Sequence, residues 1–366
     1  MKNENLKTFL KILGVIFALY MFLVGINGLS SGIKHLGKGF ASTIMSTTEN
    51  PILALFIGIL ATTLFQSSST TTSLIVGMVS GGALGLKGAI PMIMGANIGT
   101  TVTNTIVSIG HINRGNEFKR AFAASTIHDF FNILAVIILL PLEIWFGIIE
   151  KASIGLGEML FGTLSTDQVF KSPIKKAIKW GAKQLEALSF DNNTLYIIIS
   201  VVVTFIMLYL IVKLLRSLVL KKIEVLFDQY IFKTAIRGII FGMLLTISVQ
   251  SSSITTSTVV PLAGAGVLTL RQIFPFTLGA NIGTTVTALL ASLSLNVTAM
   301  VAAFSHLFFN LFAILLIYPW KWSRNIPIKL AEWMAGAAIK NKFIPIVYLI
   351  LLFFVLPLII ISLGGN

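Results

Sequence analysis

The chain lacks cysteine altogether and contains few charged residues. With no Cys among 366 residues, disulfides and thiolate chemistry are both excluded. Charged residues make up 11% of the chain, whereas a soluble domain carries roughly 25%. So few charges could not cover a soluble surface of this size, which excludes a large soluble core. The sequence also lacks a Walker loop, an HExxH motif and a nucleophile elbow, so we predict that it is not an enzyme.

Apolar residues, in contrast, are abundant and arranged in long runs. They account for 55% of the chain, and the mean hydropathy is +0.92. Five segments are almost uncharged and long enough to cross roughly 30 Å of hydrocarbon as helices. These segments are Phe9–Ile26, Phe130–Phe146, Leu195–Val212, Val301–Tyr318 and Ile344–Ile361. The sequence therefore predicts an all-α integral membrane protein. We interpret the first segment as a span, because it lacks the small-residue cleavage site of a signal peptide.

The net charge of +14 comes from basic residues that lie beside the apolar runs. Lys213, Arg216 and the lysines that follow them indicate a cytoplasmic loop, and Lys2 and Lys7 favour a cytoplasmic N-terminus. Such residues also attract anionic lipid headgroups, and they could concentrate an anionic substrate. Because they do not gather on one soluble face, we expect no binding of nucleic acid.

A polar stretch of the chain occurs twice. Gln-Ser-Ser-Ser at 66–69 returns at 250–253, and Gly-Ala-Asn-Ile-Gly-Thr-Thr-Val-Thr at 95–103 returns at 279–287, both 184 residues further on. His-x-Phe-Phe-Asn at 128–132 returns at 306–310, an offset of 178 residues. The six missing residues place an exposed turn at Ile109–Glu117 in the first half, since length changes belong in exposed loops.

The repeats divide the chain into residues 1–162, a polar Lys-rich connecting segment at 163–193, and residues 194–366. Within the connecting segment, Ser172-Pro173 and lysines spaced three or four apart predict an amphipathic surface helix on the outer side. Apolar segments are interrupted by polar motifs at corresponding places in both halves. This pattern predicts two inverted-topology repeats with broken helices or re-entrant hairpins, as in secondary transporters.

The repeated motifs offer hydroxyls, amides and glycines but no formal charge. A half-helix that begins at such a run points free backbone N–H groups and a positive dipole end at an anion. We expect Gly95, Gly99, Gly279 and Gly283 to permit unwinding, which would expose carbonyl oxygens to a cation. Neither motif contains Lys or Arg. A neutral site in a membrane could hold a dianion only together with cations.

Three features have a structural alternative. Ser and Thr clusters also join transmembrane helices, although two clusters at one offset favour a binding site. His128/Asn132 and His306/Asn310 are i, i+4 pairs on helices that could serve packing alone. Asp129 follows the first histidine but has Leu307 at its partner position. An acid in a membrane segment is a functional candidate.

These motifs resemble those of the type II sodium–phosphate cotransporters, including their bacterial members. The resemblance rests on the paired Gln-Ser-Ser-Ser motifs, each followed by Gly-x-Asn-Ile-Gly-Thr-x-x-Thr. It also includes the run Phe118–Ala123 and its continuation through His128–Asn132.

The resemblance implies sodium-driven uptake of inorganic phosphate by alternating access, with Na⁺ as the coupling ion and no other cofactor. The implied phosphate ligands are Ser67, Ser68, Ser69, Ser251, Ser252 and Ser253, with Asn97 and Asn281 at unwound turns. The implied sodium ligands are Gln66, Gln250, Thr100, Thr103, Thr284 and Thr287. The protein would be a multi-pass protein of a bacterial plasma membrane, surrounded by lipid, and a homodimer is left open.

The chain departs from the family pattern at two places. Ala280 stands where some members have Ser, and the loop from His111 to Glu117 lacks the Asp of electrogenic animal members. The resemblance therefore predicts neither the sodium count nor electrogenicity. A passive anion channel, a phosphate sensor or scaffold, and a transporter of another tetrahedral oxyanion remain as alternatives.

Overall fold

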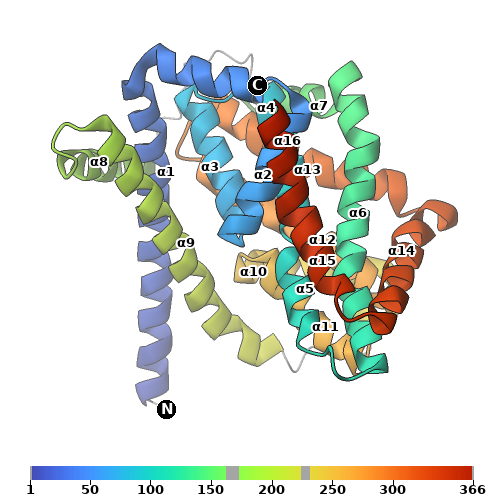
Figure 1. Cartoon of the computed structure of the whole chain (residues 1–366). Helices are drawn as coiled ribbons and strands as arrows, with labels where there is room; N and C mark the ends of the chain where they lie inside the picture. Colours follow the sequence, from blue (N-terminus) through green and yellow to red (C-terminus); the bar gives the residue numbers. More distant parts are fainter. Residues whose placement is uncertain (1, 162–172, 224–230, 365–366) are drawn as a thin grey trace.

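The structure, a computed structural model, describes residues 2–161, 173–223 and 231–364, and every regular element in these ranges is a helix (Figure 1). The first half contains α1 (Lys2–Thr48), α2 (Pro51–Phe65), α3 (Ser68–Gly81), α4 (Leu86–Gly99), α5 (Val102–Ile109), α6 (Asn116–Phe146) and α7 (Ile148–Phe161). Next come α8 (Pro173–Ala187), α9 (Asn193–Ile223), η2 (Ile231–Lys233), α10 (Ala235–Val249), α11 (Ser252–Gly264), α12 (Leu270–Ser292) and α13 (Val297–Ile317). The described chain ends with α14 (Lys321–Lys340), α15 (Ile344–Ile350), η3 (Leu351–Val355) and α16 (Leu356–Gly364).

Six helical stretches in the described ranges are long and apolar enough to cross a membrane. Five of them correspond to the five spans expected from the sequence, and only Tyr318 of the expected residues falls outside its stretch. The sixth is α12, which the sequence pattern had divided into short pieces. Its window is 78% buried inside the protein, which explains why its hydropathy is the lowest of the six. The integral membrane class and the all-helical fold are thereby confirmed.

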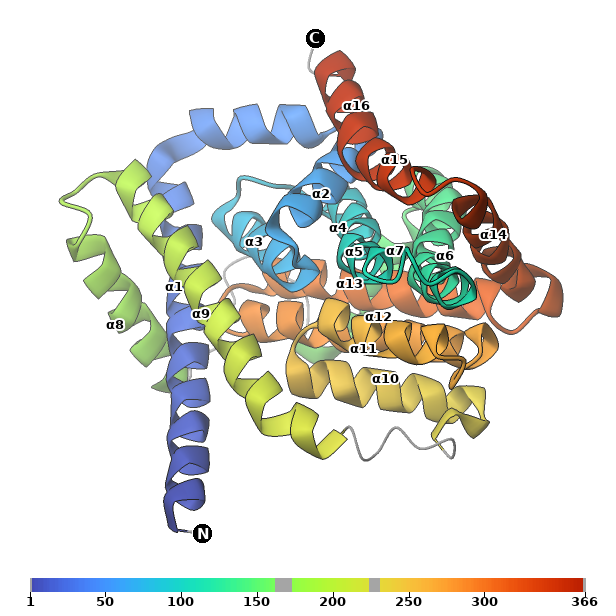
Figure 2. The same cartoon turned by 60° about the horizontal axis from the view of Figure 1, so that its bottom comes forward.

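The first helices of the two halves run antiparallel, as expected for inverted repeats. Helices α1 and α9 lie side by side (Figures 1 and 2). From the N-terminal end of α1 onward, Gly14 faces Leu214, Gly25 faces Thr204, and Gly32 faces Ile197. The partner number falls as the α1 number rises, so the helices are antiparallel. A Cβ at Gly25 would lie 2.6 Å from the Thr204 hydroxyl, so the seam depends on small residues.

Each half contains a helical hairpin with its tip at the repeated glutamine. Gln66 joins α2 to α3 with φ 54°, and Gln250 joins α10 to α11 with φ 56°. These left-handed residues break the helices at equivalent places. In the first hairpin, the Thr62 and Thr71 hydroxyls are 2.9 Å apart across the two arms. The expected broken helices are therefore present at both Gln-Ser-Ser-Ser motifs.

The repeated glycines serve close packing, which corrects the expectation that they unwind their helices. Gly95 and Gly99 belong to α4, and α12 continues through Gly279, Asn281 and Gly283 as one helix. A Cβ at Gly95 would lie 2.0 Å from the Leu55 carbonyl oxygen of α2. In the second half, a Cβ at Gly279 of α12 would lie 1.9 Å from the Ile239 carbonyl oxygen of α10. The glycines are needed because backbone meets backbone, so Asn97 and Asn281 do not sit at unwound turns.

The first half alone breaks its glycine helix, at Thr100 and Thr101 between α4 and α5. Both residues keep right-handed helical dihedrals, so the interruption is a slight offset rather than an extended segment. Residues 110–115 then form the turn expected before α6, and its tip is exposed.

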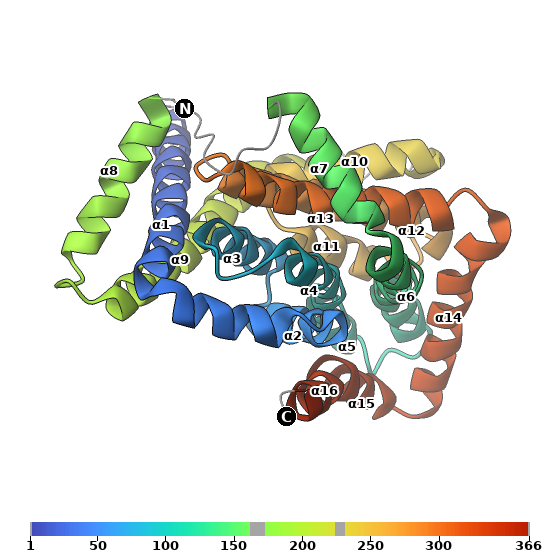
Figure 3. The ribbon, with the colours of Figure 1, turned by 90° about the horizontal axis from the view of Figure 1, so that it is seen from above.

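Helix α8 confirms the amphipathic segment expected between the halves, although Ser172 and the rest of 162–172 lie outside the described residues. It lies beside α1 (Figure 3), along the upper part of that helix and away from the N-terminus (Figure 1). Tyr20 Oη donates to the Ala177 carbonyl oxygen at 3.0 Å, which ties α8 to α1. Its face of Ile178, Gly181 and Leu185 is buried.

Candidate functional site

Both Gln-Ser-Ser-Ser motifs border one cavity of about 800 Å³, here named the inner cavity. The first motif contributes Gln66 and Ser67, and the second contributes Ser251 and Ser253. The remaining wall is formed mainly by α9. The inner cavity reaches Lys213 and Arg216 of α9, two of the basic residues from which the sequence predicts a cytoplasmic loop. Two motifs that are 184 residues apart in sequence thus face the same space.

Helices α3 and α11 both begin at the inner cavity with the same cap. The Ser67 hydroxyl accepts from Thr70 N, and the Ser251 hydroxyl accepts from Ile254 N. Both serines have extended dihedrals, φ −156° and −154°. The first backbone amides of each half-helix have no carbonyl partner within their own helix. Two positive helix ends therefore meet at one neutral site, which favours a bound anion.

Each hairpin tip is tied to the following helix by a Gln–Thr pair. Thr103 Oγ1 donates to Gln66 Oε1 at 3.0 Å, and Thr287 Oγ1 donates to Gln250 Oε1 at 2.8 Å. Each glutamine Nε2 donates to a carbonyl oxygen three residues before it, at 2.7 Å in both halves. The amide oxygens keep a free lone pair beside the threonine hydroxyls. Grouped neutral oxygens of this kind suit a hard cation.

Two serines connect the halves. Ser69 Oγ donates to Thr287 Oγ1 at 3.3 Å, and Ser253 Oγ donates to the Thr100 carbonyl oxygen at 3.2 Å. The structure thus brings together Ser69 with Thr287 and Ser253 with Thr100, as expected for a site between the repeats.

Other expected ligands lie behind the cavity wall. Ser68 and Ser252 are each 3% exposed, and their carbonyl oxygens accept from threonine hydroxyls one turn later. Thr284 Oγ1 donates to the Ala280 carbonyl oxygen of its own helix, and Thr100 Oγ1 donates to the equivalent Ala96 oxygen. The Thr100 and Thr284 hydroxyls are thus satisfied within their own helices, and none of these four residues lines the inner cavity.

Asn97 is held by α13 of the opposite half. His306 Nε2 donates to Asn97 Oδ1 at 3.0 Å, and Asn97 Nδ2 donates to Asn310 Oδ1 at 2.8 Å. All three side chains are at most 3% exposed. The asparagine therefore joins α4 of the first half to α13 of the second.

Asn281 of the second half makes the equivalent contacts with α6 of the first half. His128 Nε2 donates to Asn281 Oδ1 at 2.5 Å, and Asn281 Nδ2 donates to Asn132 Oδ1 at 2.9 Å. No pattern in the sequence indicated that each His–Asn pair would bond an asparagine of the other half. The one signal in the sequence that could have suggested these contacts was that both the asparagines and the His–Asn pairs repeat.

Asp129 is the buried acid of this region, fully shielded on α6. Its Oδ2 accepts from the Tyr348 hydroxyl of α15 at 2.8 Å. Leu307 at the partner position cannot make this bond, so the contact exists in the first half only. Nothing in the sequence connected Tyr348 with Asp129.

Opposed hairpins with polar tips at one cavity, in a helical chain that spans a membrane, define the class of secondary transporters. The family model of the Na⁺/Pi-cotransporter matches residues 21–166 and 205–326. The chain therefore belongs to the Na⁺/Pi-cotransporter family, a family of transporters and not of enzymes.

Curated relatives support the same assignment. The chain is 33% identical to the rat sodium-dependent phosphate transport protein 2A, over 95% of this chain and 67% of the relative. It is 31% and 32% identical to protein 2B of Pongo abelii and of human, over 94% of this chain and 64% of each relative. The chain thus spans about two thirds of the length of these relatives. No solved structure matches it significantly.

Proposed function

We propose that the protein couples the movement of sodium to the uptake of inorganic phosphate across a bacterial plasma membrane. The observation that carries this proposal is the inner cavity, where two neutral hydroxyl motifs and two helix N-termini meet without a lysine or arginine in either motif. Membership of the Na⁺/Pi-cotransporter family supports the substrate and the coupling ion.

Phosphate would bind at the two helix N-termini that face the inner cavity. Ser67, Ser251 and Ser253 already line it, and Ser68, Ser69 and Ser252 follow in the same turns. Backbone amides and hydroxyls can donate to phosphate oxygens, but they bring no compensating charge. Bound sodium would supply that charge, which makes coupling a consequence of the neutral site.

Sodium would bind at the Gln–Thr pairs, where neutral oxygens gather. Gln66 with Thr103 forms one such group, and Gln250 with Thr287 forms the other. Thr100 and Thr284 would join through small shifts of their helices. The amides of Asn97 and Asn281 are bonded at both ends, so we assign these residues to helix positioning rather than to phosphate contact.

Alternating access would exchange the environments of the two hairpins. The inverted repeats contribute one tip each, and in this conformation the inner cavity extends towards Lys213 and Arg216. Rocking one half against the other would close this path and open the opposite one.

Uptake of labelled phosphate into proteoliposomes, with and without an inward sodium gradient, tests the proposal. We expect uptake only with sodium, and uptake independent of sodium would contradict it. Gln250→Ala should lower the apparent sodium affinity several-fold, because Thr287 loses its partner and the cation an oxygen. The control Lys176→Ala, on the exposed side of α8, should leave the affinity unchanged.

Two further measurements separate the alternatives. Unsaturable currents that persist without a gradient would indicate an anion channel. Full competition by sulfate would indicate a general oxyanion transporter, whereas competition by arsenate alone would agree with a phosphate site.

A further inference from the structure

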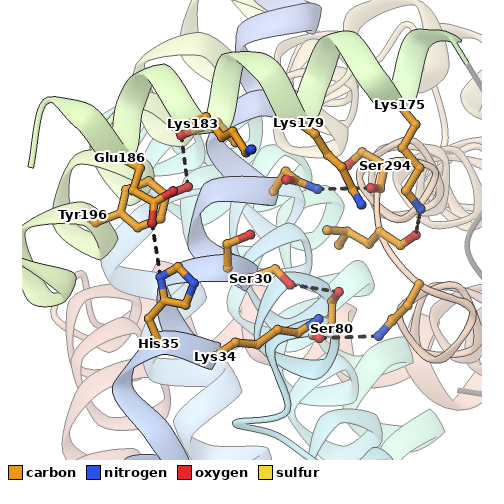
Figure 4. A pocket seen from close by; sticks show the side chains of 15 residues that line it. Ser30, Lys34, His35, Ser80, Lys175, Lys179, Lys183, Glu186, Tyr196 and Ser294 are labelled. Carbon is orange, nitrogen blue, oxygen red and sulfur yellow. Dashed lines mark hydrogen bonds and ion pairs between the residues drawn. The ribbon is translucent and has the colours of Figure 1, made fainter. Parts of the chain in front are cut away.

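A second polar cavity of about 300 Å³ lies under α8, here named the outer pocket (Figure 4). Its wall combines α8, the upper part of α1, the end of α3 and the turn between α12 and α13. The inner cavity meets the first turn of α3, and the outer pocket meets Ser80 near its last turn. At 1.5 Å per helical residue, the two lie about 20 Å apart along this helix.

The outer pocket is strongly cationic. Lys34, Lys175, Lys179 and Lys183 all line it, and Glu186 is its single acidic residue among those described. The Oε1 atom of Glu186 lies 3.4 Å from His35 Nδ1, so this carboxylate faces the histidine ring. Figure 4 shows Lys175 and Lys179 directed from α8 into the space, with Lys34 reaching it from α1. The positive charge therefore greatly exceeds the negative charge in a small volume.

Lys175 is the buried member of this group, at 7% exposure. Its Nζ donates to the Leu295 carbonyl oxygen of the α12–α13 turn. Burial lowers the pKa of this ammonium group, and the charges of Lys179 and Lys34 lower it further. The lysines thus repel one another across the outer pocket, and a bound anion would relieve that repulsion.

Neutral donors and a helix end complete the pocket. The Ser30 hydroxyl donates to Ser80 Oγ at 2.9 Å, and Asn296 Nδ2 donates to the Ser80 carbonyl oxygen at 3.4 Å. Asn296 also caps α13, because its Oδ1 accepts from Ala299 N. Helix α13, with its positive end, therefore begins next to a residue that lines the outer pocket. Hydroxyls, ammonium groups and a helix N-terminus together suit the oxygens of a phosphate group.

We propose that the outer pocket binds a phosphate group, supplied either by inorganic phosphate or by the headgroup of an anionic phospholipid. The first source rests on the proposed function, since the pocket would then collect the substrate on the outer side. The second source is consistent with α8, which exposes Ile174 and Trp180 as an interfacial helix would. Unlike the uncharged Gln-Ser-Ser-Ser motifs, a pocket lined by four lysines holds an anion without sodium.

Lysine footprinting in proteoliposomes tests this binding directly. The full chain in phosphatidylcholine vesicles is treated with a membrane-permeant acylating reagent in sodium-free buffer, and modification is quantified by mass spectrometry. Inorganic phosphate should slow the acylation of Lys179 and Lys183 several-fold relative to chloride of equal ionic strength. Lys176 lies on the same helix, is exposed and does not line the pocket, so its rate should not change.

A lipid occupant gives a different result in the same assay. Vesicles that contain phosphatidylglycerol would then protect Lys179 and Lys183 whether or not inorganic phosphate is present. Equal acylation of Lys176, Lys179 and Lys183 under all conditions would overturn the proposal. Because no transport is needed for the footprint, a wild-type protein without sodium-dependent uptake would contradict the proposed function alone.

A matched pair of variants connects the pocket to transport. If inorganic phosphate is the occupant, Lys179→Gln combined with Lys183→Gln should raise the phosphate KM several-fold in phosphatidylcholine vesicles and leave kcat unchanged. If the lipid is the occupant, the double variant should lose the protection by phosphatidylglycerol with no change of KM in phosphatidylcholine. Lys176→Gln is the control for charge. A double variant still protected like the wild type would contradict the assignment.

Discussion

At Gln66 and Gln250 the two halves of the molecule take nearly the same backbone dihedrals and make the same two side-chain bonds. Their surroundings differ, since Gln66 is exposed at the inner cavity and Gln250 is 8% exposed. Local geometry is therefore set by the repeated motif, whereas access is set by the packing of whole helices. In the proposed alternating-access mechanism, such a difference would let one half be open while its counterpart is closed.

Other differences gather in the first half. Its glycine helix is broken at Thr100 and Thr101, and Asp129 bonds Tyr348. Asn104 accepts from Thr256 Oγ1 at 3.0 Å, whereas its partner position holds Ala288. The halves agree in the backbone contacts of the repeated glycines and in the Gln–Thr and His–Asn contacts, and they differ at the three places just named. The repeated motifs thus keep their contacts in both halves, and the first half adds polar contacts that have no counterpart in the second.

The largest effect should follow from filling the glycine contacts that both halves share. Gly279→Ala would place a Cβ 1.9 Å from the Ile239 carbonyl oxygen, and Gly95→Ala would meet the Leu55 oxygen at 2.0 Å. Neither backbone can move without separating the hairpin from its helix, so we expect a cost above about 3 kcal/mol for each. The fraction of monodisperse protein and its thermal unfolding in detergent measure the loss.

Gly336→Ala is the matched control, because a Cβ there meets nothing within 4 Å on helix α14. It should leave stability unchanged or raise it by up to about 1 kcal/mol. Similar unfolding temperatures for Gly279→Ala and Gly336→Ala would show that the backbone contact is not required.

An equal effect in the two halves is expected at the two asparagines that connect them. Asn97→Ala leaves buried groups of His306 and Asn310 unpaired, and Asn281→Ala does the same on the other side. Each unpaired buried group costs about 1–3 kcal/mol. Thermal unfolding should therefore fall similarly in both variants. A large loss in one and none in the other would show that the network is not symmetric in energy.

The sequence predicted the scaffold well because its signals are local. Apolar runs set five spans, and polar interruptions marked both hairpin tips. The prediction was wrong at α12. There the glycines were expected to unwind the helix, but they allow its backbone to approach α10 closely. A glycine permits both outcomes, and only the neighbouring backbone decides between them.

Partners of the site residues could not be predicted for a related reason. The contacts of Asn97 with Asn310 and of Asp129 with Tyr348 join residues more than 200 positions apart. One sequence shows that such groups exist, but not which pairs face each other. The outer pocket could not be predicted for the same reason. The spacing of the α8 lysines indicated a surface helix, but it did not indicate that serines of α1 and α3 lie opposite these lysines.

The smallest effect should come from Asn104→Ala, which makes the first half resemble the second. The Thr256 hydroxyl would lose Asn104 Oδ1 but keep the Ser252 carbonyl oxygen at 2.8 Å, so it remains satisfied. We expect a loss of about 1 kcal/mol, the usual net value of one hydrogen bond. A double-mutant cycle with Thr256→Ala, read by thermal unfolding, isolates this bond. Additive losses in the two single variants would contradict a direct contact between Asn104 and Thr256. An unchanged unfolding temperature together with a raised phosphate KM would show that Asn104 contributes to phosphate transport rather than to stability.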